Sequence, residues 1–206
     1  MTVDLVIFDI GNVLIEWNPE RHYDAVIGQK RREAMFAEVD LHGMNELVDR
    51  GEDFRATIYD WAEKYPHWRD EIRMWHDNWI KLARPAIDHS VRLLRALRAH
   101  GVPVQALTNF GIGSFAVAEA HYPFLKEFDL RHISGEMRLI KPDPQIYAAV
   151  EARCGFPASN ILFADDRAEN IAAAEARGWQ GHLFGGPQGW ADRLVAEGLL
   201  SPAEAV

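Results

Sequence analysis

The first predicted strand of this chain constrains its fold more than any other segment. An apolar run at residues 5–8 leads without interruption into Asp9. Such a run is typical of a strand that is buried on both faces, as in a parallel sheet covered by helices. Open parallel sheets bind their ligands at the carboxyl ends of the strands, so Asp9 is expected at a functional edge. Two later apolar strands also end in polar residues, at Thr108-Asn109 and at Asp165-Asp166.

Helices and strands alternate along the chain after Pro85. Besides the first strand, the patterns predict strands near residues 102–107, 130–133, 160–164 and 182–184. The helices between them are predicted near residues 87–100, 113–121, 142–152 and 168–177. Gly101 and Gly178 occupy the usual glycine position just beyond a helix C-terminus. This alternation predicts an α/β fold with a parallel sheet and right-handed crossovers.

Residues 18–84 show helical patterns and no strand pattern. Asn18 is a favourable N-cap, and Pro19 suits the first position of a helix. Aromatic and apolar residues then recur at helical spacing in two segments: Phe54, Ile58, Trp61 and Tyr65, then Trp68, Ile72, Trp75, Trp79 and Leu82. We therefore predict an all-helical insertion after the first strand. Its tryptophans are expected to form the core of the insertion, and stacking of Trp75 or Trp79 on a sugar ring is the alternative.

The composition excludes several classes of function. With 206 residues, of which 48% are hydrophobic, the chain can build one core of ordinary size. A net charge of −9 argues against nucleic-acid or anionic membrane partners, and the basic cluster at residues 30–32 is interpreted as an exposed helix face. The single Cys154 excludes an intramolecular disulfide, and no segment suits a membrane span or a secretion signal. We expect a cytoplasmic monomer or homodimer that binds neither nucleic acid nor membrane.

The polar groups at the strand ends suit the transfer of a phosphoryl group. A carboxylate such as Asp9 can attack an electrophilic centre directly, and phosphoryl transfer then needs mainly positioning and charge neutralisation. Two more carboxylates beside it would form an all-oxygen site that suits Mg²⁺, which acts as a Lewis acid and a template. Lys141 adds positive charge, while Thr108 and Asn109 offer hydrogen bonds to phosphate oxygens. Each segment alone is also compatible with a turn or a helix cap.

Four segments in order resemble the motifs of the haloacid dehalogenase-like hydrolases. They are FDIGNVL, LTN, KPDPQIY and FADDRAEN, and together they span nearly the whole chain. The resemblance implies a Rossmann-like parallel-sheet core, residues 1–17 and 85–206, with a small all-helical cap at residues 18–84. It also implies roles for individual residues: Asp9 as nucleophile, Lys141 as a catalytic and substrate-binding residue, Thr108 and Asn109 as substrate-binding residues, and Asp9, Gly11, Asp165 and Asp166 as ligands of Mg²⁺.

Within this family the chain looks like the bacterial sugar-phosphate phosphatases of the α-D-glucose-1-phosphate phosphatase type. The expected function is Mg²⁺-dependent hydrolysis of a small phosphorylated metabolite, such as a sugar phosphate, through an aspartyl-phosphate on Asp9. A 2-haloacid dehalogenase is one alternative. It is a poorer match, because the metal-free chemistry of the family accompanies a Ser- or Asn-bearing fourth motif, whereas this chain has Asp165-Asp166.

Gly11 departs from the family pattern. Most phosphatases of this family carry an aspartate there, which serves as general acid and then base, a contribution worth roughly 10²–10⁴-fold in rate. The backbone carbonyl of Gly11 can still bind a metal, but it cannot transfer a proton. Three hypotheses follow: a substrate with a good leaving group, such as a sugar 1-phosphate; another proton donor, for which Glu16, His42 and His76 are candidates; or a sugar-phosphate-binding protein without catalysis.

Two glycines follow the Thr108-Asn109 segment. Gly111 and Gly113 would let the backbone approach a phosphate closely. This is a hypothesis from their position after the second motif.

Overall fold

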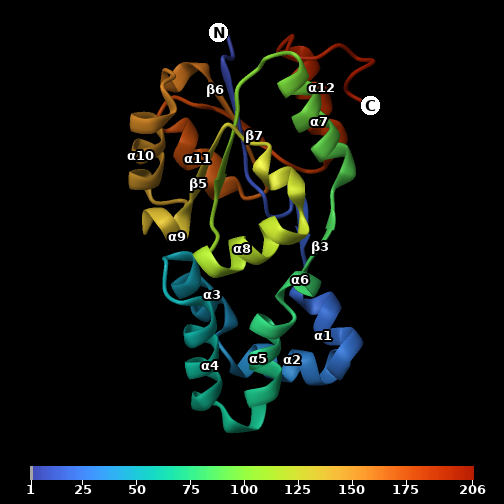
Figure 1. Ribbon diagram of the computed structural model, residues 1–206, viewed down its shortest axis with the longest axis vertical. Coiled ribbons are helices and arrows are strands. Elements are labelled where there is room, and N and C mark those ends of the chain that lie inside the picture. The colour runs from blue at the N-terminus through green and yellow to red at the C-terminus, as the bar shows by residue number, and fades with distance from the viewer. Residues whose placement is uncertain (1) are drawn as a thin grey trace.

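A five-stranded parallel sheet forms the core of the upper half of the molecule as drawn in Figure 1, in a computed structural model that describes residues 2–206. Its strand order is β5-β4-β1-β6-β7, so the first strand lies in the middle. The strands are β1 (Leu5–Phe8), β4 (Val104–Thr108), β5 (Leu130–Ile133), β6 (Ile161–Asp165) and β7 (Gln180–Leu183). This confirms the predicted α/β class and the predicted burial of the first strand, and it places that strand at the centre of the sheet.

Both faces of the sheet are covered, because successive side chains of β1 point to opposite sides. Val6 and Phe8 belong to one hydrophobic cluster, while Leu5 and Ile7 belong to a second one. The first cluster is completed by α7 (Asp88–Ala99), α8 (Ile112–His121) and α12 (Pro187–Ala196). The second is completed by α10 (Pro144–Cys154) and α11 (Ala168–Glu175). All four residues of β1 have no exposed surface, as an uninterrupted apolar run requires.

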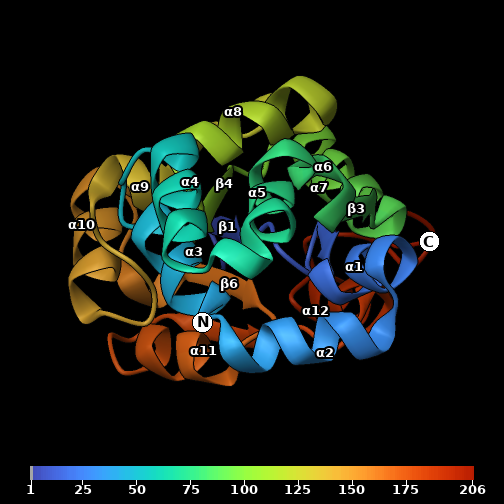
Figure 2. The same cartoon turned by 90° about the horizontal axis from the view of Figure 1, so that it is seen from below.

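Helices occupy the whole stretch between β2 (Ile15–Trp17) and β3 (Ala83–Ala86). They are α1 (Pro19–Ile27), α2 (Gln29–Glu38), α3 (Leu41–Asp49), α4 (Phe54–Lys64), the short 3₁₀ helix η1 (Pro66–Trp68), α5 (Arg69–Asp77) and α6 (Trp79–Leu82). Figure 2, which looks onto this helical part, shows α3, α4 and α5 in front of β1 and β4. The helical part therefore lies over the edge of the sheet where Asp9 follows β1.

An antiparallel pair, β2 with β3, connects the helical part to the sheet, and the sequence patterns do not predict it. Ile15 pairs with Ala86, and Trp17 pairs with Ala83. The strands have only three and four residues, and Pro85 lies within β3, so neither shows the alternation by which strands are identified. The predicted helix beyond Pro66 also divides, because α5 ends at Asp77 and α6 begins two residues later.

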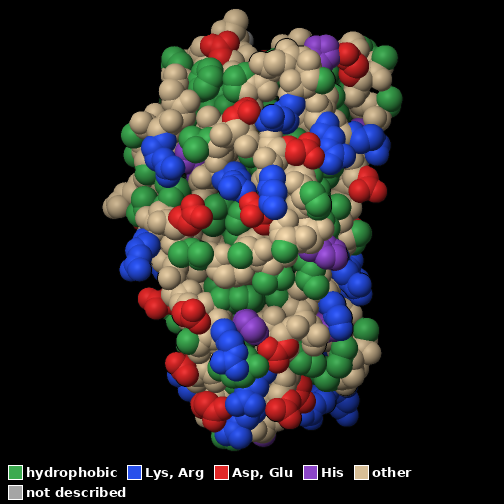
Figure 3. Space-filling view, viewed as in Figure 1, with side chains coloured by type: hydrophobic (Ala, Val, Ile, Leu, Met, Phe, Trp, Pro, Cys, Tyr) green, Lys and Arg blue, Asp and Glu red, His purple; other side chains and the backbone are tan. Residues whose placement is uncertain are grey.

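Smaller elements complete the fold: α9 (Ser134–Met137), η2 (Pro123–Lys126) and η3 (Ala158–Asn160). No helix within residues 2–206 is long and apolar enough to cross a lipid bilayer. On the face shown in Figure 3, acidic and basic side chains are interspersed rather than gathered into one patch of a single charge. The basic cluster at residues 30–32 lies on α2, where Arg31 and Arg32 form ion pairs with Glu71 and Asp24. This pairing fits the interpretation of the cluster as a solvated helix face.

Candidate active site

A cavity of about 640 Å³ lies between the carboxyl edge of the sheet and the helical part. Its floor contains residues from every segment singled out in the sequence: Asp9, Gly11, Thr108, Asn109, Lys141 and Asp166. The helical part supplies the opposite wall, which includes His42, Asn45, Asp49, Trp75 and Trp79. Segments that are up to about 150 residues apart in the chain thus meet at one edge of the sheet, as parallel strands allow.

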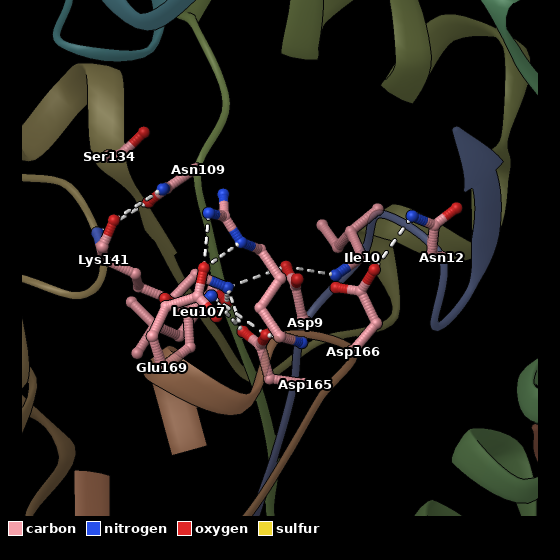
Figure 4. Close-up of polar contacts among 12 residues, drawn as sticks. Asp9, Ile10, Asn12, Leu107, Asn109, Ser134, Lys141, Asp165, Asp166 and Glu169 are labelled. Carbon is pink, nitrogen blue, oxygen red and sulfur yellow. Dashed lines mark hydrogen bonds and ion pairs between the residues drawn. The ribbon is translucent and has the colours of Figure 1, made fainter. Parts of the chain in front are cut away.

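Lys141 joins two of the aspartates at the floor of this cavity (Figure 4). Its Nζ atom lies 3.0 Å from Asp9 Oδ1 and 2.6 Å from Asp165 Oδ2, and it also donates a hydrogen bond to the carbonyl oxygen of Leu107 at 3.0 Å. Asp165 has no exposed surface, and Lys141 is 2% exposed. The backbone N–H of Ile10 donates to Asp9 Oδ1 at 2.7 Å. These contacts hold the Asp9 carboxyl in one orientation.

Burial and the charge of Lys141 shift the pKa of Asp9 in opposite directions. Burial raises the pKa of Asp9 to about 7, with smaller increases from Asp165 and Asp166, while Lys141 lowers it. Burial lowers the pKa of Lys141, but the two adjacent carboxylates outweigh it and leave that pKa raised. Lys141 therefore stays charged at neutral pH. Additional positive charge beside Asp9 would favour its ionised, nucleophilic form.

The two aspartates that follow Ala164 have different surroundings. Asp165 accepts hydrogen bonds from the Arg167 backbone N–H at 2.8 Å and from the Asn170 side chain at 2.9 and 3.0 Å, besides its contact with Lys141. Asp166 is half-buried, lines the cavity and accepts one hydrogen bond, from Asn12 Nδ2 at 2.9 Å. Asp165 is therefore suited to hold Lys141 in place, whereas Asp166 offers oxygen atoms to the cavity.

This group of carboxylates fits a divalent cation. One oxygen from each of Asp9, Asp165 and Asp166 lies within 4.8 Å of the others. When all three are ionised, one lysine leaves two negative charges uncompensated in a largely buried site. Hard cations such as Mg²⁺ prefer oxygen ligands of this kind. Gly11 lines the same cavity, so its backbone carbonyl is near enough to be considered as a further ligand.

Thr108 and Asn109 are brought to the site in different ways. Thr108, the last residue of β4, is buried and forms part of the cavity wall. Asn109 exchanges two hydrogen bonds with the backbone of Lys141, donating from Nδ2 at 2.9 Å and accepting at Oδ1 at 2.8 Å. The Asn109 side chain thus fixes the loop that carries Lys141.

Of the three proton donors suggested by the sequence, His42 lines the cavity, whereas Glu16 and His76 do not. Glu16 is only partly buried and forms an ion pair with Arg21 at 2.6 Å. His76 lies 2.8 Å from Asp77 and packs against Phe54, outside the cavity wall. His42 does line the cavity, from an exposed position on α3.

Asp49, at the end of α3, also lines the cavity and was missed in the sequence. No local pattern distinguishes it from the other acidic residues on exposed turns of helices. Burial raises the pKa of Asp49 to about 7.

The structure also shows what the tryptophans and glycines singled out in the sequence contact. Trp75 and Trp79 are buried in the hydrophobic core of the helical part, as predicted, and they also line the cavity with Trp17, whose ring centroid lies 5.6 and 5.8 Å from theirs. A Cβ atom added at Gly111 would lie 2.9 Å from the carbonyl oxygen of Val48, and one at Gly113 would lie 2.8 Å from Phe54 Cβ. These glycines allow the helical part to approach the sheet closely, which is a different close approach from the phosphate contact hypothesised for them.

Comparisons with known proteins show which family this chain is similar to. The family profile of the haloacid dehalogenase-like hydrolases matches residues 3–178. A sesquiterpene phosphatase, astK, of Aspergillus oryzae is 27% identical over 192 residues, which cover 88% of this chain and 90% of that protein. An (S)-2-haloacid dehalogenase of Pseudomonas fluorescens is 32% identical over 100 residues, which cover 48% of this chain and only 41% of the dehalogenase.

Solved structures show the same fold at lower identity. A HAD family enzyme from Bacteroides thetaiotaomicron superposes with a TM-score of 0.76 at 20% identity, covering 94% of this chain and 99% of that one. The same enzyme has been crystallised with magnesium and inorganic phosphate, and that structure superposes with a TM-score of 0.68 at 21% identity, covering 87% and 93% of the two chains.

Proposed function

Because the chain belongs to the haloacid dehalogenase-like hydrolases, and is therefore a hydrolase, we propose that it is a Mg²⁺-dependent phosphomonoester hydrolase. Its substrate would be a small phosphorylated metabolite, and the reaction would pass through an aspartyl-phosphate on Asp9. The observation that carries this proposal is the contact of Asp9 with Lys141 beside two further carboxylates, at the floor of a covered cavity. We also propose that residues 1–17 and 85–206 act as the core and residues 18–84 as its cap.

Each residue of the site has a role in the proposed reaction. Asp9 attacks phosphorus with its carboxylate, and Lys141 balances the negative charge of the phosphate and holds the Asp9 carboxyl. Thr108 offers its hydroxyl to a phosphate oxygen, and Asn109 keeps Lys141 in position. Asp9, Asp166 and the carbonyl of Gly11 would hold Mg²⁺, with Asp165 beside them. The ion supplies Lewis-acid stabilisation of the phosphoryl oxygens when bound.

The donor set and the relatives favour a phosphatase over a dehalogenase. Asp165 and Asp166 add two carboxylates that would repel the carboxylate of a haloacid, whereas a cation between them would attract a phosphate. The relative that matches over 88% of this chain is a phosphatase, and a structural neighbour binds magnesium and phosphate. The dehalogenase match spans about two fifths of that relative's length.

A sugar phosphate is the substrate class that we propose for the cavity. Trp17, Trp75 and Trp79 line one wall of the cavity, and Trp17, which is only partly buried, offers an apolar ring to the apolar face of a sugar. Polar side chains of the cap, including Asn45, lie beside that wall and suit hydroxyl groups. The volume of about 640 Å³ is ample for a phosphorylated monosaccharide.

A panel of phosphate esters tests the proposed reaction. The panel contains sugar phosphates, a prenyl phosphate and an aryl phosphate, with 2-chloropropionate as a haloacid control, and each is assayed with and without Mg²⁺. We expect phosphate release that needs Mg²⁺ and that falls by at least about 10³-fold in Asp9→Asn. Asp60→Asn, a change on an exposed part of α4, serves as the matched control and should keep full activity.

Two outcomes would overturn the proposal. Chloride release from the haloacid without added metal would show a dehalogenase. A wild-type protein that hydrolyses no ester, yet binds sugar phosphate, would show a binding protein without catalysis. Trapping of one phosphoryl group on wild-type protein, and not on Asp9→Asn, would support the aspartyl-phosphate directly.

A further inference from the structure

We propose that Asp49 of the cap is the general acid and base of the reaction, in place of the aspartate that this chain lacks at Gly11. The inference rests on the proposed phosphomonoester hydrolysis and adds a catalytic residue to it. Asp49 is the last residue of α3 and lies in the wall of the cavity that contains Asp9.

Three contacts from different elements hold Asp49 in place. Asn45 Nδ2, one helical turn earlier, donates a hydrogen bond to Asp49 Oδ2 at 2.9 Å. Ser134 Oγ, on α9 of the core, donates to the backbone carbonyl of Asp49 at 2.7 Å and accepts from the backbone N–H of Phe110 at 2.8 Å. The backbone N–H of Gly111 interacts with the carboxyl itself. The backbone of Asp49 is therefore tied to the core and its carboxyl to Asn45, although the residue belongs to the cap.

The position of Asp49 suits the leaving group of a phosphate ester. Asp9 follows β1 at the floor of the cavity, whereas Asp49 lies in the wall contributed by the cap. In phosphoryl transfer the attacking and leaving oxygens lie roughly in line with phosphorus between them. A phosphate attacked by Asp9 therefore directs its leaving oxygen away from the floor, toward the cap. Asp49 and Asp9 are also close enough for the charge of one to raise the pKa of the other.

The other titratable side chains around the cavity are less suited to this role. They are His42, Glu46, Arg50, Lys141, Asp166 and Arg167. Glu46 and Arg50 are exposed and form an ion pair at 2.9 Å, and Arg167 pairs with Glu169. Lys141 is held between two carboxylates, and Asp166 belongs to the proposed metal site. His42 is exposed to solvent, so it lacks the fixed environment that Asp49 has.

The protonation of Asp49 also matches the task. Burial raises its pKa to about 7, and the negative charges of Glu46 and Asp9 raise it as well, against the lowering contributions of Gly111 and Asn45. A carboxyl with a pKa near the working pH is present in both forms, which is what a group that first donates and then accepts a proton requires.

The two proton transfers balance the reaction. In the first step Asp9 Oδ forms a bond to phosphorus, the bond to the leaving oxygen breaks, and its electron pair takes the proton of Asp49 to give the alcohol. In the second step Asp49 accepts a proton from water as the water oxygen attacks phosphorus. The bond from phosphorus to Asp9 then breaks, its electron pair returns to the Asp9 carboxylate, and inorganic phosphate leaves. Asp49 regains its proton in the second step.

A single-turnover comparison of two leaving groups tests this role. Asp49→Asn is assayed with an alkyl phosphate, which needs protonation of its leaving oxygen, and with p-nitrophenyl phosphate, which does not. We expect the rate of Asp9 phosphorylation to fall by about 10²–10⁴-fold for the alkyl ester and by less than about threefold for the aryl ester. The size of the nitrophenolate burst measures the fraction of correctly folded active sites. Phosphorylated Asp9 should accumulate in Asp49→Asn, because the variant no longer activates the attacking water. Glu52→Gln, an exposed carboxyl three residues further on, is the matched control.

The outcomes separate this proposal from the proposed function. Equal rate losses for both esters would show that Asp49 only maintains the structure, and unchanged rates for both would show that it takes no part; either result overturns the proposal. If the wild type phosphorylates from neither ester, or Asp9→Asn remains as active as the wild type, the phosphatase function itself fails. With Asp49 as the acid, the fall of the alkyl-ester rate above about pH 7 should be absent in Asp49→Asn.

Discussion

At the residue scale, the same residue type takes on different properties according to its contacts. Asp165 is surrounded by donors from Lys141, Arg167 and Asn170, while the Asp166 side chain accepts a hydrogen bond from Asn12. The sequence predicts that both lie at the end of a strand, because that depends on local pattern. It cannot separate their roles, since the difference arises from contacts with Lys141 and Asn12, which come from distant segments.

Substituting the two aspartates one at a time should separate a structural role from a metal-binding one. Asp165→Asn removes one of the two carboxylates that contact the buried Lys141 and leaves Asp9 in place, so we expect the free energy of unfolding to fall by about 1–3 kcal/mol. Asp166→Asn, at a half-buried position with one hydrogen bond, should change it by less than about 1 kcal/mol while weakening Mg²⁺ binding by at least about tenfold.

Urea unfolding and Mg²⁺-dependent thermal shifts measure these two effects separately. Bound ligand raises Tm according to its affinity for the folded state, so the loss of the thermal shift reports the loss of the metal. The assignment of Asp166 as the main ligand is wrong if Asp166→Asn retains the wild-type shift with Mg²⁺.

The residue that the sequence did not predict, Asp49, shows the same limit more sharply. Asp9 could be found because it ends a buried strand, and strand ends in a parallel sheet meet at one edge. Asp49 acquires its surroundings from Ser134 and Gly111, which lie more than 60 residues away along the chain. The local sequence of a cap helix does not indicate which residues of the core will contact it.

At the scale of the elements, the docking of the cap on the core depends on close backbone approach. Gly111 begins the turn into α8 and faces Val48 of α3, and Gly113 faces Phe54 at the start of α4. The strands of the parallel sheet and the helices between them (α7, α8, α10 and α11) were predicted to within about two residues, because each has its own pattern of apolar residues. The β2–β3 pair was not predicted, because these short strands are stabilised by pairing with each other and the whole cap separates them in the sequence.

A methyl group at Gly111 should therefore disturb the cap more than the core. The added Cβ would lie 2.9 Å from the Val48 carbonyl oxygen, so α3 must move away. We expect Gly111→Ala to lower the free energy of unfolding by about 1–3 kcal/mol and to lower kcat, because Asp49 and Val48 move together. Gly189→Ala is the matched control, since its Cβ meets nothing within 4 Å and it lies within α12. There we expect no loss of activity and a gain in stability of up to about 1 kcal/mol.

Denaturant unfolding together with steady-state rates checks this prediction. If Gly111→Ala retains wild-type kcat while losing stability, cap docking and catalysis are not coupled through this contact. If both alanine variants behave alike, the close approach at Gly111 has no energetic consequence.

At the scale of the whole molecule, the response of stability to pH combines groups of opposite sign. Burial lowers the pKa of His132 to about 4, and the positive charge of Arg153 lowers it too. His132 Nε2 lies 2.9 Å from Gln105 Oε1, and its Nδ1 has no hydrogen-bond partner within residues 2–206. The pKa values of Asp9 and Asp49 are raised to about 7, so these two carboxyls add to stability as the pH falls, whereas His132 subtracts from it. The net charge of −9 indicates none of this, because it does not depend on which groups are buried.

The contribution of His132 can be isolated by substitution. The pKa of His132 in the folded protein lies below its ordinary value of 6.5. As the pH falls from about 6.5 to 4, His132 therefore binds a proton in the unfolded chain but not in the folded protein. Stability from this group is therefore complete above pH 6.5 and is lost toward pH 4, by about 3 kcal/mol in total. Asp9 and Asp49 gain stability over the same range, so the wild-type curve alone mixes the two effects. His132→Gln should remove the acid-labile part, so its free energy of unfolding relative to that of the wild type should rise by about 2 kcal/mol as the pH falls from about 6.5 to 4.5. Urea unfolding across this range measures the difference, and parallel curves for the two proteins would show that His132 is not the buried group that senses acid.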